Sequence, residues 1–207
     1  MTAMSLSPSK IGKFQEMFGA ALRKAEYLFD DEAQQIIEND WNELCPELES
    51  ACVAAINKVR ERKRNTIVVV AKKVDYTRTP LLAIQATRRT ENLTNSVVAT
   101  MPRRAEGMVE NLPVVFFKLG RNVTAEELER EYEHRGLVPD PYAQAAINEQ
   151  DSAFADEHPN GTQWGRESNA SSCLSFHRWG DGRRRVYCGR DVSSWDGRWW
   201  FAGVRKS

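Results

Sequence analysis

The chain has 207 residues, of which 41% are hydrophobic and 28% are charged, and its formal net charge at pH 7 is +0. This balance is typical of a globular protein with a sizeable core and argues against wholesale disorder. The neutral net charge excludes attachment to nucleic acid or to an anionic membrane by bulk electrostatics alone, so any such attraction would need a local excess of charge.

Residues 7–64 show the spacing of a helical pair. Apolar residues recur every three or four positions over residues 11–25 and again over residues 41–59, which places an apolar stripe on one face of each helix. The second helix closes on a basic run, Lys58, Arg60, Arg62, Lys63 and Arg64. Such cations favour the negative end of a helix, and a nucleic-acid patch is the alternative interpretation.

Residues 65–119 change to the pattern of strands. The β-branched run at residues 66–70 is typical of a central strand, and residues 81–87, 96–101 and 113–119 are further strand candidates. Four strands without an intervening helical pattern predict an antiparallel meander. We expect the N-terminal helices to cover one of its faces.

Two short helices have clear local signals between residues 124 and 150. Thr124 and Glu127 have the spacing of a capping box, and Gly136 is placed to end this helix in the left-handed conformation. Asp140 and Pro141 then provide a capping side chain and a proline at the first position of a second, alanine-rich helix. Residues 151–164 have the composition of a loop.

Residues 171–207 alternate apolar and polar side chains around glycine turns, which is typical of short antiparallel strands. Gly180, Asp181 and Gly182 give a hairpin signal. The expected fold class is α+β: an N-terminal helical pair, a central antiparallel sheet, two short helices and a C-terminal three-stranded β-meander. Two domains are expected, residues 1–118 with the first helices and the sheet, and residues 119–207 with the helix pair and the aromatic, arginine-rich meander.

Several motifs follow one another in a distinctive order after residue 119. It comprises the capped helix, RGLVP at residues 135–139, ADEHP at residues 155–159 and WDGRWWFAGVRK at residues 195–206. This order resembles a C-terminal module found in uncharacterised proteins of phages and uncultured bacteria. The resemblance covers residues 119–207 and implies a phage- or mobile-element-associated accessory protein, but it supplies no activity and no site residues.

The sequence offers little catalytic chemistry. Cys45, Cys52, Cys173 and Cys188 lack the spacing of a zinc site. Cys173 and His177 could act as nucleophile and base, yet residues four positions apart on a strand lie about 13 Å from each other. Cys173 could instead meet Cys188 across the hairpin, as a core pair or a disulfide. No catalytic residue, metal site or cofactor is therefore expected, and an enzyme is not favoured.

Tryptophan and arginine are concentrated at the end of the chain. Five of the six tryptophans lie after residue 163, interleaved with eight arginines. These residue types are enriched at binding hot spots and also stack on nucleic-acid bases, although a small aromatic core would use tryptophan too. Alternation along a terminal strand places Trp199 and Phe201 on one face and Trp200 on the other.

The leading hypothesis is a non-enzymatic interaction protein that binds a protein partner through this tryptophan and arginine cluster. The alternative is single-stranded nucleic-acid binding by the same cluster. The candidate binding residues are Trp179, Arg183, Arg184, Arg185, Trp195, Arg198 and Trp200.

The expected setting is cytoplasmic and does not involve a membrane. No stretch of the sequence approaches the ~20 apolar residues of a membrane span, and residues 1–14 lack the apolar segment of a signal peptide. The sequence does not indicate an oligomeric state.

Overall fold

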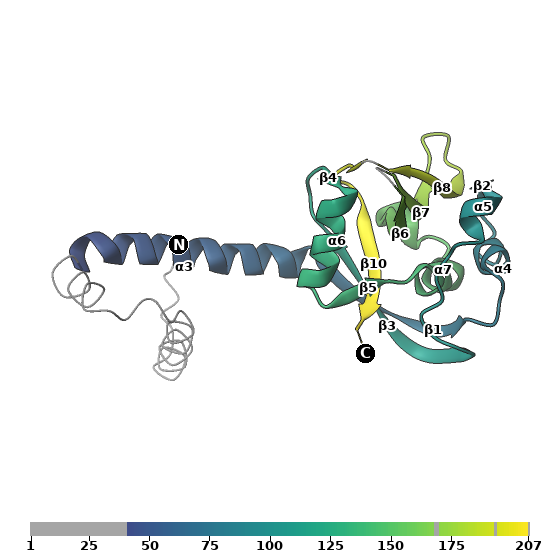
Figure 1. The fold of residues 1–207 in the computed structure, drawn as a ribbon, viewed down its shortest axis with the longest axis horizontal. Coiled ribbons are helices and arrows are strands. Elements are labelled where there is room, and N and C mark those ends of the chain that lie inside the picture. Colours follow the sequence, from purple (N-terminus) through teal and green to yellow (C-terminus); the bar gives the residue numbers. More distant parts are fainter. Residues whose placement is uncertain (1–40, 168–169, 193, 207) are drawn as a thin grey trace. The chain divides into compact units, whose positions relative to one another are not determined.

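The computed structural model describes residues 41–167, 170–192 and 194–206 (Figure 1). The chain divides into two units, Met1–Lys58 and Val59–Ser207, which are described separately. The helix α3 (Trp41–Arg64) contains the described residues of the first unit and the first residues of the second. It confirms the second predicted helix, with Pro46 near its start and a basic last turn. The first predicted helix lies outside the described residues.

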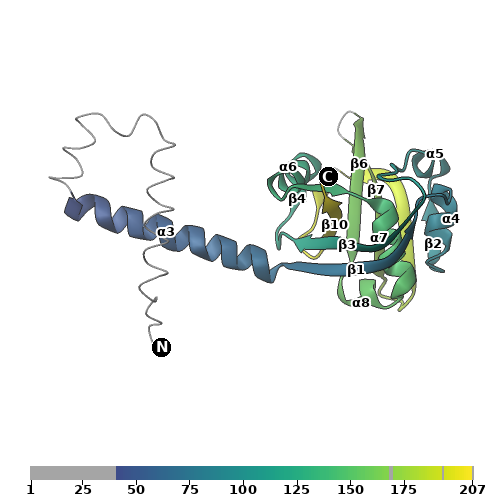
Figure 2. The ribbon, with the colours of Figure 1, turned by 90° about the horizontal axis from the view of Figure 1, so that it is seen from below.

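The second unit is built around one mixed sheet of eight strands (Figure 2). In spatial order they are β1 (Thr66–Asp75), β3 (Met108–Lys118), β10 (Trp200–Arg205), β6 (Asn160–Glu167), β7 (Ala170–Arg178), β8 (Arg184–Val192) and β2 (Thr90–Leu93), with β5 (Leu137–Pro139) paired to β10. The β10–β6 and β2–β8 pairs are parallel and the others are antiparallel. A separate two-stranded sheet joins β4 (Val123–Thr124) to β9 (Ser194–Trp195).

Helices cover both faces of the large sheet, so the expected α+β class is correct. In Figure 1, α6 (Ala125–His134) lies on one side of β10, and α7 (Pro141–Gln150), α4 (Pro80–Gln85) and α5 (Asn95–Val98) lie on the other. The larger core includes Ile84, Ile147 and Phe176 and lies on the α7 face. The smaller core includes Phe117, Leu128 and Phe201 and lies on the α6 face.

Two of the four predicted strands are helices, so the predicted central meander is wrong. Residues 81–87 mostly form α4, because Thr79 caps the helix by accepting a hydrogen bond from Leu82 N (3.3 Å) and Pro80 occupies its first turn. The first three of residues 96–101 belong to α5, in which Val97 and Val98 are buried. In α4 the capping side chain and the proline at the first position outweigh the strand preference of the apolar side chains.

The predicted β7–β8 hairpin is confirmed, but the third strand of the predicted meander lies elsewhere. β10 is inserted between β3 and β6 and does not pair with β8. Phe201, Ala202, Gly203 and Val204 are all buried, as expected of a central strand with both faces covered. The pairing of β10 with β3 crosses the predicted domain boundary after residue 118. The predicted loop at residues 151–164 contains α8 (Phe154–Glu157) and the start of β6.

The two predicted helices after residue 124 are confirmed together with their caps. Thr124 Oγ1 accepts from Glu127 N (3.2 Å), and Glu127 Oε2 accepts from Thr124 N (2.8 Å). Gly136 has φ of +61°, a conformation that favours glycine. Asp140 Oδ1 accepts from Ala143 N (3.0 Å) at the start of α7. The Tyr132 hydroxyl donates to Ala202 O (2.8 Å) and fastens α6 to β10.

Replacing Thr124 by alanine is expected to lower the free energy of unfolding by about 1 kcal/mol, because Glu127 N loses its capping acceptor. The melting temperature should fall by about 2–4 °C for a unit of this size. Thermal unfolding of Thr124→Ala and Thr124→Ser checks this, since serine keeps the hydroxyl. Equal destabilisation by both substitutions would show that the cap does not contribute.

Candidate functional site: an aromatic cleft

A cleft lies above β7 and β8 on the α6 face of the sheet. Alternate residues of the two strands line it, Cys173, Ser175 and His177 from β7 and Arg185 and Tyr187 from β8. It consists of two neighbouring hollows of about 350 and 390 Å³, which share His177, Trp179 and Trp199. We call it the aromatic cleft and define it by His177, Trp179, Arg185, Trp195, Arg198 and Trp199.

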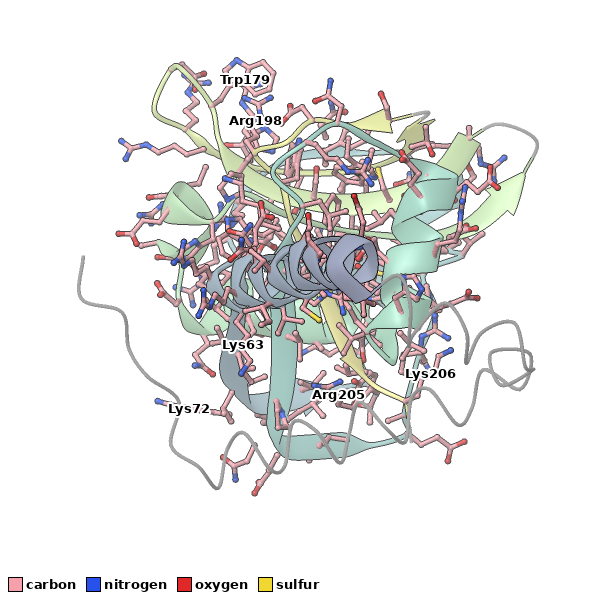
Figure 3. The ribbon with its side chains drawn as sticks, turned by 90° about the vertical axis from the view of Figure 1, so that its left-hand side faces the viewer. Lys63, Lys72, Trp179, Arg198, Arg205 and Lys206 are labelled. Carbon is pink, nitrogen blue, oxygen red and sulfur yellow. The ribbon has the colours of Figure 1, made fainter. Side chains whose placement is uncertain are left out.

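Two tryptophans stand on either side of a histidine in the aromatic cleft. Trp179 follows the end of β7 and is 55% exposed, whereas Trp199 immediately precedes β10 and is half-buried. The His177 ring lies between them, with centroid distances of 5.3 Å to Trp179 and 5.7 Å to Trp199. Trp179 and Arg198 line the same hollow and lie close together in Figure 3. The three rings therefore give the aromatic cleft an apolar surface that reaches solvent.

Trp195 packs beneath Trp199, on the core side of this surface. It is only 4% exposed, and its Nε1–H donates to Gln163 Oε1 at 3.0 Å. Its ring packs so closely on Gly161 that a Cβ there would lie 2.6 Å from Cη2. Edge-to-face contacts connect Trp195 to Trp199 (5.2 Å) and Phe201 (5.5 Å). Trp199 is thus held by the core of the protein.

The arginines of the aromatic cleft are paired with aspartates. Arg185 lies over the Trp179 ring at 5.3 Å, and its Nη2 is 2.8 Å from Asp181 Oδ2. Arg198 lies over the Trp199 ring at 5.8 Å, and its Nε is 3.0 Å from Asp196 Oδ2. Each cation contacts an indole face while a carboxylate compensates its charge. The arrangement orients the rings and leaves little free positive charge.

His177 is neutral at pH 7. Burial lowers the pKa of its imidazole, and the charges of Arg198, Arg185 and Arg89 act in the same direction. Both ring nitrogens are buried without a hydrogen-bond partner among the described residues. Leaving buried polar atoms without a partner costs free energy. The ring contacts with Trp179 and Trp199, rather than hydrogen bonds, hold His177 in place.

The lowered pKa of His177 has a consequence for stability. Its pKa in the folded protein lies below the ordinary value of 6.5, so its neutral form stabilises the fold above pH 6.5 and this contribution is lost as the pH falls. We expect the His177→Phe variant to lose less stability between about pH 7.5 and pH 5.5 than the natural chain. Denaturant unfolding of both chains at the two pH values checks this. An equal loss in both chains would contradict the assignment.

The structure brings four of the seven predicted binding residues together in the aromatic cleft: Trp179, Arg185, Trp195 and Arg198. Trp195 is a core residue there and not the surface residue that was predicted. Arg183 lies at the hairpin turn, where its side chain is 71% exposed. These positions follow from the alternation of side chains along β7 and β8.

The other two predicted binding residues lie on the opposite face of the sheet. Arg184 Nη2 is 2.8 Å from Asp156 Oδ2, and its Nη1 donates to Ser152 Oγ at 3.0 Å. Trp200 packs on the larger core, with its ring 5.1 Å from that of His158. Trp199 takes the place expected of Trp200. The alternation of the terminal strand already grouped Trp199 with Phe201, and this was the signal that could have identified it.

The cysteines do not form the predicted pair. Cys173 lies opposite Gly189 in the β7–β8 register, and Cys188 lies opposite Leu174, so the two side chains are on different faces and no disulfide joins them. Burial raises the pKa of Cys188 to about 12, which keeps it a thiol. Cys173 and His177 both line the aromatic cleft, but Ser175 lies between them on the strand.

The described part of the chain contains neither a candidate metal site nor a candidate membrane-spanning helix. Residues 41–167, 170–192 and 194–206 contain no group of three or more His, Cys, Asp or Glu side chains that could hold a metal ion. Within the same ranges, no helix has both the length and the apolar character needed to cross a bilayer.

A further hollow, of about 270 Å³, lies between α7 and β1. Within it Arg78 is paired with Glu149, since Arg78 Nη1 is 2.6 Å from Glu149 Oε2, and the backbone N–H of Lys72 donates to Gln150 Oε1 at 2.9 Å. The aromatic cleft therefore remains the candidate functional site.

Comparison of the chain with protein-family models, with curated proteins and with solved structures finds no match in any of the three.

Proposed function

We propose that this protein is a non-enzymatic interaction protein that holds a segment of a protein partner in the aromatic cleft. The observation that carries the proposal is the exposed Trp179 facing the half-buried Trp199 across His177. Exposed tryptophan beside oriented arginine is the composition of interface hot spots. Hollows of about 350 and 390 Å³ suit an apolar or aromatic side chain and its neighbours in the partner.

The charge pattern favours a protein partner over single-stranded nucleic acid. Binding of a phosphate backbone depends on cations that are free to replace counterions. In the aromatic cleft, Asp181 and Asp196 already compensate Arg185 and Arg198. Stacking of a nucleobase on Trp179 is the competing function, and it predicts a steep loss of affinity with added salt.

The biological setting belongs to the same proposal. The motif order of residues 119–207 supports a phage- or mobile-element-associated accessory protein, and the composition supports a cytoplasmic location. A partner protein of the host or of the element itself would be the occupant of the aromatic cleft.

Affinity capture with the tagged full chain from a host lysate tests the proposal. Natural protein, Trp179→Ala and Met108→Ala are compared with and without nuclease, since Met108 is an equally exposed apolar residue of β3, outside the aromatic cleft. We expect a nuclease-resistant protein that the natural chain and Met108→Ala retain and Trp179→Ala loses. Recovery of only nuclease-sensitive nucleic acid, or equal recovery by all three chains, would overturn the proposal.

A further inference from the structure

Another hollow, whose lining differs in chemistry from that of the aromatic cleft, lies where α3, α6 and β10 end. It has a volume of about 280 Å³ and is lined by Arg62, Lys63, His134, Arg135 and Arg205, with Thr66, Val115 and Leu137. We call it the cationic pocket and define it by the first five of these residues. Among the described residues, no carboxylate lines it.

Core contacts hold the wall of the cationic pocket in place. The Arg135 side chain is 9% exposed, lies over the Phe117 ring at 4.3 Å and is 3.3 Å from Glu131 Oε2 through Nε. Arg205 Nη1 donates to Arg135 O at 2.9 Å, which connects the end of β10 to the end of α6. Thr66 Oγ1 donates to Arg62 O at 2.6 Å at the end of α3. Contacts within the protein therefore fix the positions of these lining residues.

Most cations of the cationic pocket have no counter-charge. Among the described residues, Arg62, Lys63 and Arg205 form no ion pair, and only Arg135 has a carboxylate partner. Burial lowers the pKa of Arg135, and the positive charge of Arg62 acts in the same direction. The C-termini of two helices attract some of these cations, but Arg205 belongs to a strand and Arg62 opposes Arg135. An anion in the cationic pocket would relieve this repulsion.

We propose that the cationic pocket binds a backbone phosphate of a nucleic-acid strand. Two exposed cations, Arg64 and Lys206, directly follow pocket residues in the sequence, so positive charge continues beyond one phosphate group, as a polyanion requires. Lys63, Arg205 and Lys206 can be followed in Figure 3. Arginine gives planar contacts to phosphate oxygens. Because no tryptophan or tyrosine lines the cationic pocket, the contact reads the backbone and not the base sequence.

This inference does not depend on the aromatic cleft and adds a second ligand to the proposed function. A protein that contacts a nucleic-acid backbone at one site and a protein partner at another would bring the two together. The neutral net charge does not oppose this, because the positive charge is local and screening in the cell acts over about 8 Å.

Fluorescence anisotropy with the full chain and a labelled single-stranded oligonucleotide of about 20 nucleotides tests the inference, with a duplex of the same sequence alongside. Added salt between about 50 and 200 mM should weaken binding steeply. The double variant Arg62→Gln/Lys63→Gln should weaken binding by about 10- to 30-fold near 0.1 M salt and reduce the salt slope by about 1.4, as for two lost phosphate contacts.

The control variant Lys72→Gln/Lys73→Gln removes the same charge from exposed residues of β1 outside the cationic pocket. It should bind almost as the natural chain does, and so should Trp179→Ala. Arg205→Gln, a second pocket variant, should show the loss independently. Failure of the natural chain to bind either oligonucleotide, or equal weakening by the control, would overturn the inference. Loss of binding in Trp179→Ala alone would place the nucleic acid in the aromatic cleft instead.

Discussion

Replacement of Trp195 by alanine is expected to lower the free energy of unfolding by about 4 kcal/mol, within the range for large core aromatics. The indole is 4% exposed and contacts Trp199 and Phe201. Its removal leaves a cavity above Gly161 and takes the donor from Gln163 Oε1. A decrease of roughly 8–16 °C in melting temperature should accompany the substitution.

Trp195→Phe separates the two contributions. Phenylalanine keeps an aromatic ring above Gly161 but removes the Nε1–H, so the buried Gln163 Oε1 loses its partner at a cost of about 1–3 kcal/mol. Denaturant unfolding monitored by circular dichroism measures both variants. We expect the alanine variant to be clearly less stable than the phenylalanine variant. Stability within about 1 kcal/mol of the natural chain for Trp195→Ala would contradict the core position of this residue.

Replacement of Trp179 by alanine is expected to act on binding and not on folding. An exposed tryptophan at the centre of an interface contributes about 2 kcal/mol or more, which corresponds to a loss of affinity of roughly 30-fold. The free energy of unfolding should change by less than about 1 kcal/mol, because Trp179 is 55% exposed. Isothermal titration of the captured partner, together with thermal unfolding, measures the two quantities.

Trp200→Ala is the matched control for this experiment. Trp200 packs on the larger core beside His158, on the face opposite the aromatic cleft, so its removal should reduce stability and leave the affinity of the folded protein unchanged. Loss of affinity in Trp200→Ala with full affinity in Trp179→Ala would mean that the partner binds the other face.

Local signals in the sequence predicted those elements whose ends are fixed by neighbouring residues. Thr124 with Glu127 and Asp140 with Pro141 start α6 and α7 where expected, and Gly182 turns the β7–β8 hairpin with φ of +80°. These motifs act over three or four residues and do not depend on the rest of the fold. The same reasoning, applied to Thr79 and Pro80, would have identified α4.

Long-range pairing was not accessible from the sequence in the same way. The local propensities of residues 200–205 do not indicate that β10 pairs with β3 on one side and β6 on the other, because hydrogen bonding between strands depends on the whole topology. The glycine at position 203 is consistent with the crowded centre of the sheet, because a Cβ there would lie 2.8 Å from Val138 O and 2.9 Å from the Tyr132 ring.

The candidate site was predictable in composition but not in geometry. Trp179, Arg185 and Arg198 lie in the aromatic cleft as the cluster suggested, yet Arg184 and Trp200 point to the other face of the sheet. A shift of one position along a strand moves a side chain to the opposite face of the sheet. His177, weighed in the sequence only as a possible base, is half-buried between the two tryptophans, with both ring nitrogens covered. The cationic pocket combines three separate segments of the chain. The sequence indicated only one of them, the basic run that contains Arg62 and Lys63, for which a nucleic-acid patch was the alternative interpretation.

Site-specific photo-crosslinking determines whether a protein partner occupies the aromatic cleft. A benzophenone amino acid replaces Trp179 in one chain and Met108 in another, since both residues are exposed to a similar extent. We expect that the partner is crosslinked from position 179, that unlabelled natural protein competes for it, and that position 108 gives no crosslink. Crosslinking from position 108 without crosslinking from position 179 would show that the partner binds outside the aromatic cleft.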